Sequence, residues 1–209
     1  MEGPAFPPPF AASAALKPMP DLSLDPKTTA LILIDLQKGI AGRTTAPHTS
    51  SAVIANAVLI ADRCRAVGTT VILVRVAFAA DGSDRLRTPT DETFPAGSPA
   101  ADWSEIVPEL GPKAGDLLVT KRQWGAFYGT DLELHLRRRD IKTIVIGGIS
   151  TNFGVESTAR DGWERNFAMV FVEDAMAAMS GEAHTFAITN IFPRLGLVRS
   201  TSDVLKALG

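Results

Sequence analysis

The sequence predicts an α/β fold, a three-layer αβα sandwich built on a mainly parallel sheet of about six strands. Six short apolar runs, rich in Val, Ile and Leu, recur between longer segments with helical periodicity. The runs are nearly continuous instead of alternating, which is typical of strands covered on both faces. Strands that alternate with helices along a chain favour parallel pairing through right-handed crossovers.

Each expected element follows from one of these patterns. The apolar runs predict strands over 30–36, 70–76, 116–120, 143–146, 168–172 and 197–199. The helical patterns between them cover 51–66, 130–139, 152–165, 182–191 and 202–208. Glycine and proline divide the segment 79–112, and a loop of that length usually serves as a lid, a binding loop or an oligomer contact. We expect a proline-rich arm over 1–26 and a single domain over 27–209.

Composition limits the classes of partner. The chain has 21 Lys and Arg against 23 Asp and Glu, so it carries no basic excess for binding nucleic acid or an acidic membrane. No run approaches the roughly 20 apolar residues that a membrane-spanning helix needs. One cysteine, Cys64, excludes a disulfide framework within the chain and favours a reducing, cytoplasmic location. The N-terminus lacks the features of a signal peptide, and a small molecule is the expected partner.

Two of the expected strands end in ionisable side chains. In an open parallel sheet, ligands bind outside the carboxyl ends of the strands. Asp35 directly follows the uninterrupted apolar stretch 30–34 of the first run, and Lys121 follows the third run. In one interpretation Asp35 caps a turn and Lys121 makes an ordinary ion pair. In the other they share a cleft, where the amine holds the carboxylate ionised or shares its proton.

A glycine turn follows the fourth apolar run. Gly147 and Gly148 lead into Ile149, Ser150, Thr151, Asn152, Phe153 and Gly154, ahead of a helical pattern. A strand, a glycine turn and a helix start present backbone N–H groups to an anion or to a developing negative oxygen. The same residues also fit a plain strand-to-helix turn. They match neither the dinucleotide-binding nor the phosphate-binding loop, which counts against a flavodoxin-like redox protein.

Several groups of residues together match the pattern of one family. They are Asp35-Leu36-Gln37, Lys121 with Gly125-Ala126-Phe127 and Thr130-Asp131-Leu132, Gly148 to Thr151, Gly154 to Ala159, and Glu173-Asp174-Ala175. Over about 27–200 the chain resembles the isochorismatase-like hydrolases, also called the cysteine hydrolase superfamily. The resemblance implies a parallel αβα fold, a homodimer or homotetramer, and hydrolysis of C–N bonds by an Asp, a Lys and a Cys.

The resemblance maps Asp35 and Lys121 onto the first two of those residues, and it maps Gly154 onto the position of the cysteine. Cys64 belongs to the first crossover helix and cannot replace it. Family members with glycine at that position use the Asp as general acid and base, with water in place of a thiol. We therefore expect hydrolysis of a vinyl ether C–O or an amide or carbamoyl C–N bond without a covalent Cys intermediate. The alternative is an inactive member that serves as a binding or scaffold protein.

Further expectations concern the surroundings of these three residues. The expected substrate or oxyanion contacts are Ile149, Ser150, Thr151, Asn152, Phe153, Phe78, Trp124 and Phe127. The resemblance also implies a cis peptide bond between Ile149 and Ser150. After the second strand, Ala77 to Ser83 lacks both the Thr-Ala-Gln-Pro-like context of isochorismatases and the Asp-x-His metal motif of nicotinamidases. No pair of histidines has a ligand spacing, so we expect no metal and no other cofactor.

Overall fold

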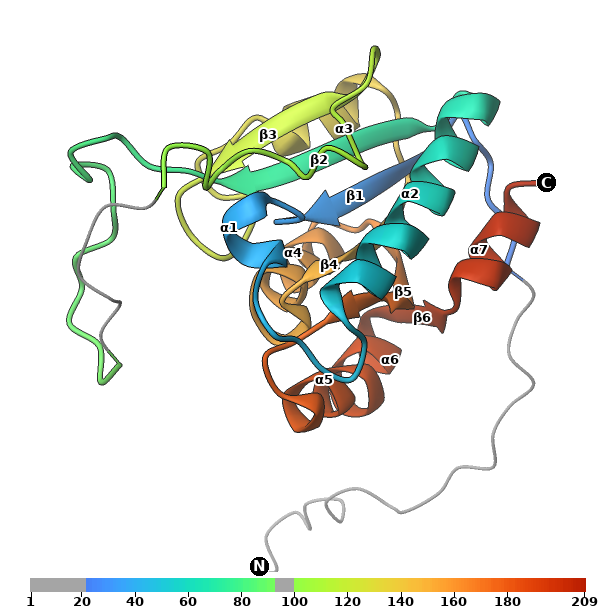
Figure 1. The fold of residues 1–209 in the computed structure, drawn as a ribbon. Helices are drawn as coiled ribbons and strands as arrows, with labels where there is room; N and C mark the ends of the chain where they lie inside the picture. The colour runs from blue at the N-terminus through green and yellow to red at the C-terminus, as the bar shows by residue number, and fades with distance from the viewer. Residues whose placement is uncertain (1–21, 93–99) are drawn as a thin grey trace, which may run out of the picture.

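The computed structural model describes residues 22–92 and 100–209, and its centre is a six-stranded parallel sheet (Figure 1). The strand order is β3-β2-β1-β4-β5-β6. The strands are β1 (Thr29–Ile34), β2 (Thr70–Val76), β3 (Leu117–Lys121), β4 (Thr143–Ile149), β5 (Ala168–Ala177) and β6 (Gly196–Arg199). The α-helices are α1 (Lys38–Ala41), α2 (Ser50–Val67), α3 (Leu132–Arg138), α4 (Glu156–Glu164), α5 (Gly181–Phe186), α6 (Phe192–Leu195) and α7 (Thr201–Ala207), with π-helical turns η1 (Thr151–Val155) and η2 (Ala187–Ile191).

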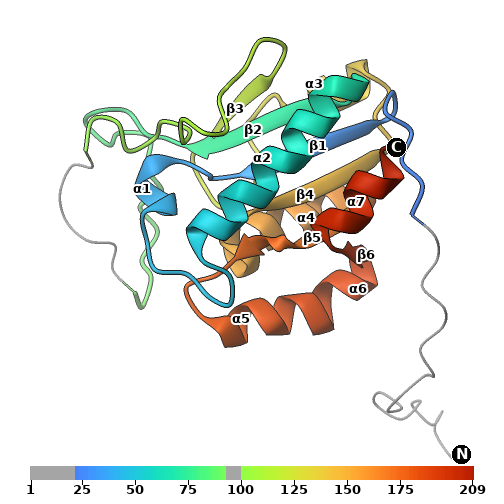
Figure 2. The same cartoon turned by 45° about the vertical axis from the view of Figure 1, so that its right-hand side comes forward.

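Helices cover both faces of the sheet, which confirms the predicted three-layer sandwich. Helices α2 and α7 lie on one face, whereas α3, α4, α5 and α6 lie on the other (Figures 1 and 2). Strand β1 supplies both cores by simple alternation: Leu31 and Leu33 face α2, and Ile32 and Ile34 face the opposite layer. Each of these side chains is fully buried, and burying one contributes about 1.5–3 kcal/mol.

Two strands are longer than the sequence predicts. Strand β4 continues to Ile149 and β5 continues to Ala177, past the ends expected at 146 and 172. The ladder between them shifts register after Ile146 and resumes with Gly148 opposite Met176. A bulge of this kind admits glycine and polar residues into a strand, so the end of the apolar run does not mark the end of the pairing.

Two helices also differ from expectation. The pattern over 152–165 begins with the π-turn η1, and only from Glu156 does the chain form regular α-helix. The pattern over 182–191 continues through η2 into α6, and Pro193 lies in the first turn of α6. The sequence did not predict the short helix α1.

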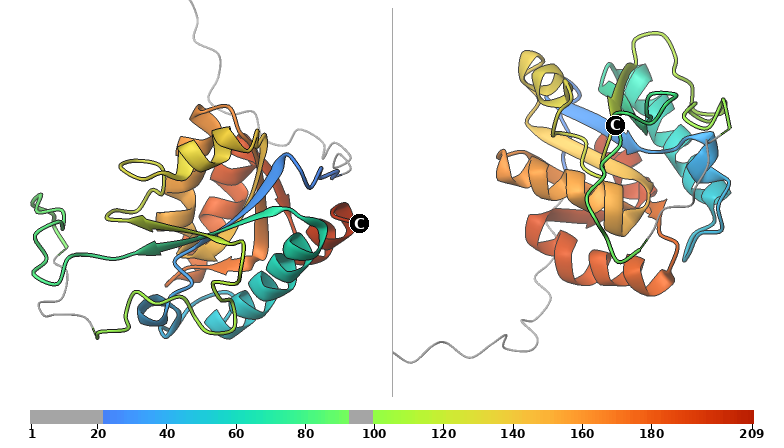
Figure 3. Two further views of the ribbon diagram at one scale, coloured as in Figure 1. Left: turned by 90° about the horizontal axis from the view of Figure 1, so that it is seen from above. Right: turned by 90° about the vertical axis from the view of Figure 1, so that its left-hand side faces the viewer.

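The segment between β2 and β3 has no helix or strand in its described residues, 77–92 and 100–116. Its first part extends away from the sheet beyond the carboxyl end of β2 (Figures 1 and 3). Residues 1–21, most of the predicted arm, lie outside the described part of the chain. Among the described residues, no helix is long and apolar enough to cross a membrane.

Gly148 is required by the packing of β4 against β1. Its φ is +126°, and a Cβ atom there would lie 2.1 Å from the carbonyl oxygen of Ile34. We expect Gly148→Ala to lose more than about 3 kcal/mol of unfolding free energy, measured by urea denaturation. Gly115→Ala is the matched control, because Gly115 has φ +94° but nothing within 4 Å of the added atom. That variant should lose only about 1–2 kcal/mol. Equal losses in the two variants would contradict the steric argument.

Candidate active site

The carboxyl ends of β1, β3 and β4 bring the three predicted central residues to one edge of the sheet. Asp35 directly follows β1, Lys121 is the last residue of β3, and Gly154 lies in η1 after β4. Strand β2 lies between β3 and β1, so the Lys121 side chain crosses it to reach Asp35. Neighbouring strands are about 4.8 Å apart, so a side chain that reaches across β2 from β3 to β1 has to be as long as that of lysine.

Asp35 and Lys121 form a buried ion pair. Nζ of Lys121 donates to Oδ2 of Asp35 at 2.7 Å and to the carbonyl oxygen of Gln123 at 3.0 Å. Their side chains are 7% and 2% exposed, respectively. Oδ1 of Asp35 is buried and has no hydrogen-bond partner within the described residues. Buried polar atoms are normally paired, so this oxygen is the part of the ion pair that can still accept a hydrogen bond.

Burial raises the pKa of Asp35 from 3.8 to about 6, and the charge and hydrogen bond of Lys121 offset part of that rise. The N–H of Val76 has a minor lowering influence and donates its hydrogen bond to Gln37 instead. A carboxyl group with a pKa near neutrality can both give and take a proton at physiological pH. Asp35 also has φ +52°, a left-handed conformation that is uncommon outside glycine and recurs at functional sites.

Gly154 faces the carboxylate of Asp35. A Cβ atom at this position would lie 3.1 Å from Oδ2 of Asp35 and 2.9 Å from Cγ2 of Ile34. The hydroxyl of Thr158 donates to the carbonyl oxygen of Gly154 at 2.7 Å and accepts from the N–H of Ala126 at 3.1 Å. Thr158 thereby joins the start of the helix after β4 to the segment after Lys121.

The glycine turn lies beside Gly154 and has the expected cis bond between Ile149 and Ser150. Ile149 and Thr151 are buried, and Oδ1 of Asn152 is buried without a hydrogen-bond partner in the described chain. The ring of Phe153 contacts that of Trp124, with centroids 4.7 Å apart. Trp124 is 56% exposed and Phe153 is 40% exposed, so they form a solvent-facing aromatic pair.

The two other predicted aromatic contacts differ in their surroundings. Phe127 is buried in the helix-covered core, where its ring stacks on Phe167, so the structure does not bring it into the site. Phe78 lies on the segment after β2, and its ring stacks on Trp103 with the guanidinium of Arg85 above it. Aromatic character alone did not distinguish a core residue from a site residue.

Gln37 makes three hydrogen bonds near the site that the sequence did not reveal. It is fully buried, and its Nε2 donates to the carbonyl oxygens of Val76 and Trp103. Its Oε1 accepts from the N–H of Val76 at 2.8 Å. Gln37 therefore ties the end of β1 to the end of β2 and to the segment that follows. The sequence feature that could have identified Gln37 is its position two residues after an aspartate at the end of a strand.

A second polar cluster joins His48, Glu173 and His184. Both histidine Nε2 atoms contact Oε1 of Glu173, at 2.7 Å for His48 and 3.1 Å for His184. Nδ1 of His184 lies 2.9 Å from the hydroxyl of Thr151 in the glycine turn. Sequence reasoning missed this cluster because its members come from three distant segments and have no ligand spacing.

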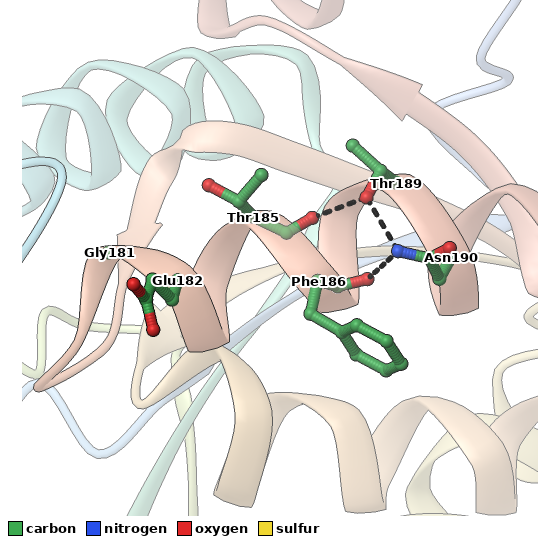
Figure 4. Close-up of a pocket in the computed structure, with 6 residues that line it drawn as sticks. All are labelled: Gly181, Glu182, Thr185, Phe186, Thr189 and Asn190. Atoms are coloured by element: carbon green, nitrogen blue, oxygen red, sulfur yellow. Dashed lines mark hydrogen bonds between the residues drawn. The ribbon is translucent and has the colours of Figure 1, made fainter.

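A surface hollow of about 440 Å³ lies against α5 and η2 (Figure 4). It is lined by Gly181, Glu182, Thr185, Phe186, Thr189 and Asn190. Asn190 and Thr189 direct their polar groups to the carbonyl oxygens of their own helix. The hollow contains none of the predicted site residues, so we do not regard it as the active site.

A buried acid and amine at the carboxyl edge of a parallel αβα sheet define an α/β protein with a candidate acid–base site. The chain belongs to the isochorismatase family, since the Isochorismatase domain model matches residues 29–203. The family consists generally of hydrolases.

Individual relatives agree with this assignment. The uncharacterised isochorismatase family protein YecD of Escherichia coli O157:H7 is 50% identical over 187 residues, which cover 90% of this chain and 100% of that protein. The ureidoacrylate amidohydrolase RutB of Pantoea ananatis is 32% identical over 222 residues, covering 90% and 85%. The solved structure of an isochorismatase family protein from Burkholderia thailandensis has 45% identity and a TM-score of 0.84, covering 90% and 98%.

Proposed function

We propose that this protein hydrolyses a small metabolite at an amide or carbamoyl C–N bond, with Asp35 and Lys121 as the acid–base pair and water as the nucleophile. The observation that carries the proposal is the buried 2.7 Å ion pair whose second carboxylate oxygen has no partner in the described chain. Such an oxygen can accept a proton from an attacking water molecule.

A thiol nucleophile is not required in this proposal. Cys64 is the chain's single cysteine, and it lies in α2 within the core on the face of Leu31 and Leu33. Burial raises the pKa of the Cys64 thiol to about 12, which removes the reactive thiolate at physiological pH. Gly154, which we propose stands at the family's cysteine position, offers no side chain to attack a substrate. Water is therefore the nucleophile that remains.

In the proposed reaction Asp35 acts first as a base and then as an acid. The Asp35 carboxylate takes a proton from water as the water oxygen bonds to the substrate's carbonyl carbon. The Lys121 ammonium stabilises the negative charge that develops on the substrate oxygen. Asp35 then gives its proton to the leaving nitrogen as the C–N bond breaks, which releases an amine and an acid. The glycine turn from Ile149 to Phe153 and the ring of Trp124 bound the proposed substrate site.

The similarity to an amidohydrolase supports the choice of a C–N bond. The second bond type, a vinyl ether C–O bond, would use the same pair in a different order. Protonated Asp35 would give its proton to the terminal vinyl carbon, and water would add to the resulting oxocarbenium ion as its proton passes to the Asp35 carboxylate. The adduct would then break its ether C–O bond, with the proton of Asp35 passing to the leaving oxygen, to give a carbonyl compound and an alcohol. The sequence Ala77-Phe78-Ala79 departs from the isochorismatase pattern after β2, which favours the amide reading.

A substrate screen tests the proposal. We expect the purified chain to turn over at least one member of a panel of amides, ureido compounds and carbamates, with vinyl ethers as the second arm. Mass spectrometry of protein quenched during turnover should show the unmodified mass, because no covalent intermediate forms. Failure of every class would favour the binding or scaffold role, and a mass increase during turnover would exclude the water route.

A further inference from the structure

The cluster of His48, Glu173 and His184 lies outside the acid–base chemistry proposed above. His48 comes from the loop before α2, Glu173 from β5 and His184 from α5. One potential ligand atom from each residue can be chosen so that all three lie within 4.8 Å of one another. The sequence predicted no metal because no two histidines have the spacing of metal ligands. Such spacing does not detect a cluster whose members come from three segments of the chain.

The geometry points to a binding site for one divalent transition-metal ion, of the class of Zn²⁺ or Co²⁺, held by the two Nε2 atoms and the Glu173 carboxylate. Two imidazoles and one carboxylate are a ligand set that zinc prefers. Tetrahedral bonds of about 2.0–2.1 Å place neighbouring ligand atoms about 3.3 Å apart. The observed contacts to Oε1, 2.7 and 3.1 Å, are close to that separation.

The side chains can make the remaining adjustment. In the set of ligand atoms that lie within 4.8 Å of one another, the most distant pair has to approach by up to about 1.5 Å. His48 lies on a loop and is 29% exposed, so its ring has room to move, whereas His184 is only 3% exposed. The partial exposure of His48 and Glu173 also gives an ion and a fourth, water ligand a path to the site.

Thr151 supplies the hydrogen-bond partner that a metal-binding histidine needs at its second ring nitrogen. Its hydroxyl oxygen lies 2.9 Å from Nδ1 of His184, and both side chains are buried. With a metal bound, Nδ1–H of His184 donates to this oxygen and Nε2 keeps its lone pair for the ion. Without a metal, Nε2–H donates to Glu173 and the Thr151 hydroxyl donates to Nδ1. The two states therefore have opposite tautomers of His184.

Calorimetric titration of the chelator-treated full chain with ZnCl₂ tests the site. We expect one ion per chain, and we expect affinity to fall at least about tenfold in His48→Gln and in Glu173→Gln. The matched control is His135→Gln, because His135 is 27% exposed and also contacts a carboxylate, that of Asp131. Absence of zinc uptake, unchanged affinity in the first two variants, or an equal loss in the control would overturn the proposal.

A second measurement needs no variant. Long-range ¹H–¹⁵N correlation spectra report which ring nitrogen of each histidine carries the proton. One equivalent of Zn²⁺ should move the proton of His184 from Nε2 to Nδ1 and leave His135 unchanged. The same equivalent should raise the melting temperature of the wild type, since a ligand of the folded state stabilises it. An unchanged His184 tautomer at saturating zinc would overturn the proposal even if the substituted chains did not fold.

Discussion

Replacing Asp35 with asparagine is expected to lower kcat/KM by about 10²–10⁴-fold on whichever substrate the screen identifies. Asparagine keeps the size of the side chain and tolerates the left-handed backbone at this position, but it cannot exchange a proton. The matched control is Asp62→Asn on α2, because Asp62 also lies 2.7 Å from a lysine, Lys113, but is 49% exposed. Unchanged turnover in Asp35→Asn would refute the mechanism.

The pH dependence of kcat/KM in the wild-type protein distinguishes the two candidate reactions. Burial raises the pKa of Asp35 to about 6. If the carboxylate accepts the proton of water, kcat/KM on an amide rises with pH until about 6 and then levels off. If protonated Asp35 instead donates its proton to a vinyl ether, kcat/KM falls as pH rises through the same value. A profile with no inflection near pH 6 on either substrate would contradict a role for this carboxyl group.

The central pair could be predicted from the sequence because Asp35 and Lys121 each end an apolar run. In a parallel sheet all carboxyl ends lie at one edge, so the position of a residue at the end of its run places it in space. The same logic places the glycine turn there. It does not give the strand order, and only the order β3-β2-β1 shows that Lys121 has to cross a strand to reach Asp35.

The residues that sequence reasoning misplaced or missed depend on contacts between distant segments. Phe127 follows the Lys121 segment like Trp124, yet its ring turns into the core against Phe167 because the chain is already entering the helical layer there. His48 and Glu173 are 125 positions apart in the sequence, and they contact each other because the fold places β5 next to β4. Periodicity and local spacing carry no information on contacts between residues that are far apart in the sequence.

Replacing Lys121 with methionine is expected to destabilise the fold by about 3–5 kcal/mol, because it leaves a buried carboxylate without its cation. Without Lys121, the pKa of Asp35 should rise further above its unfolded value of 3.8. The folded state then binds more protons than the unfolded state, so the loss should be greater at about pH 8 than at about pH 5. Urea denaturation at the two pH values measures it, and Lys113→Met should cost no more than about 1 kcal/mol.

Adding Asp35→Asn to Lys121→Met should recover stability at about pH 8, because the double variant no longer buries an unpaired charge. It should also lose the extra pH dependence, while kcat/KM stays as low as in Asp35→Asn alone. A buried ion pair often contributes no more to stability than neutral residues of similar volume. Recovery of the fold without recovery of activity would mean that Asp35 and Lys121 are kept for their chemistry. A double variant less stable than Lys121→Met would instead assign the pair a structural role.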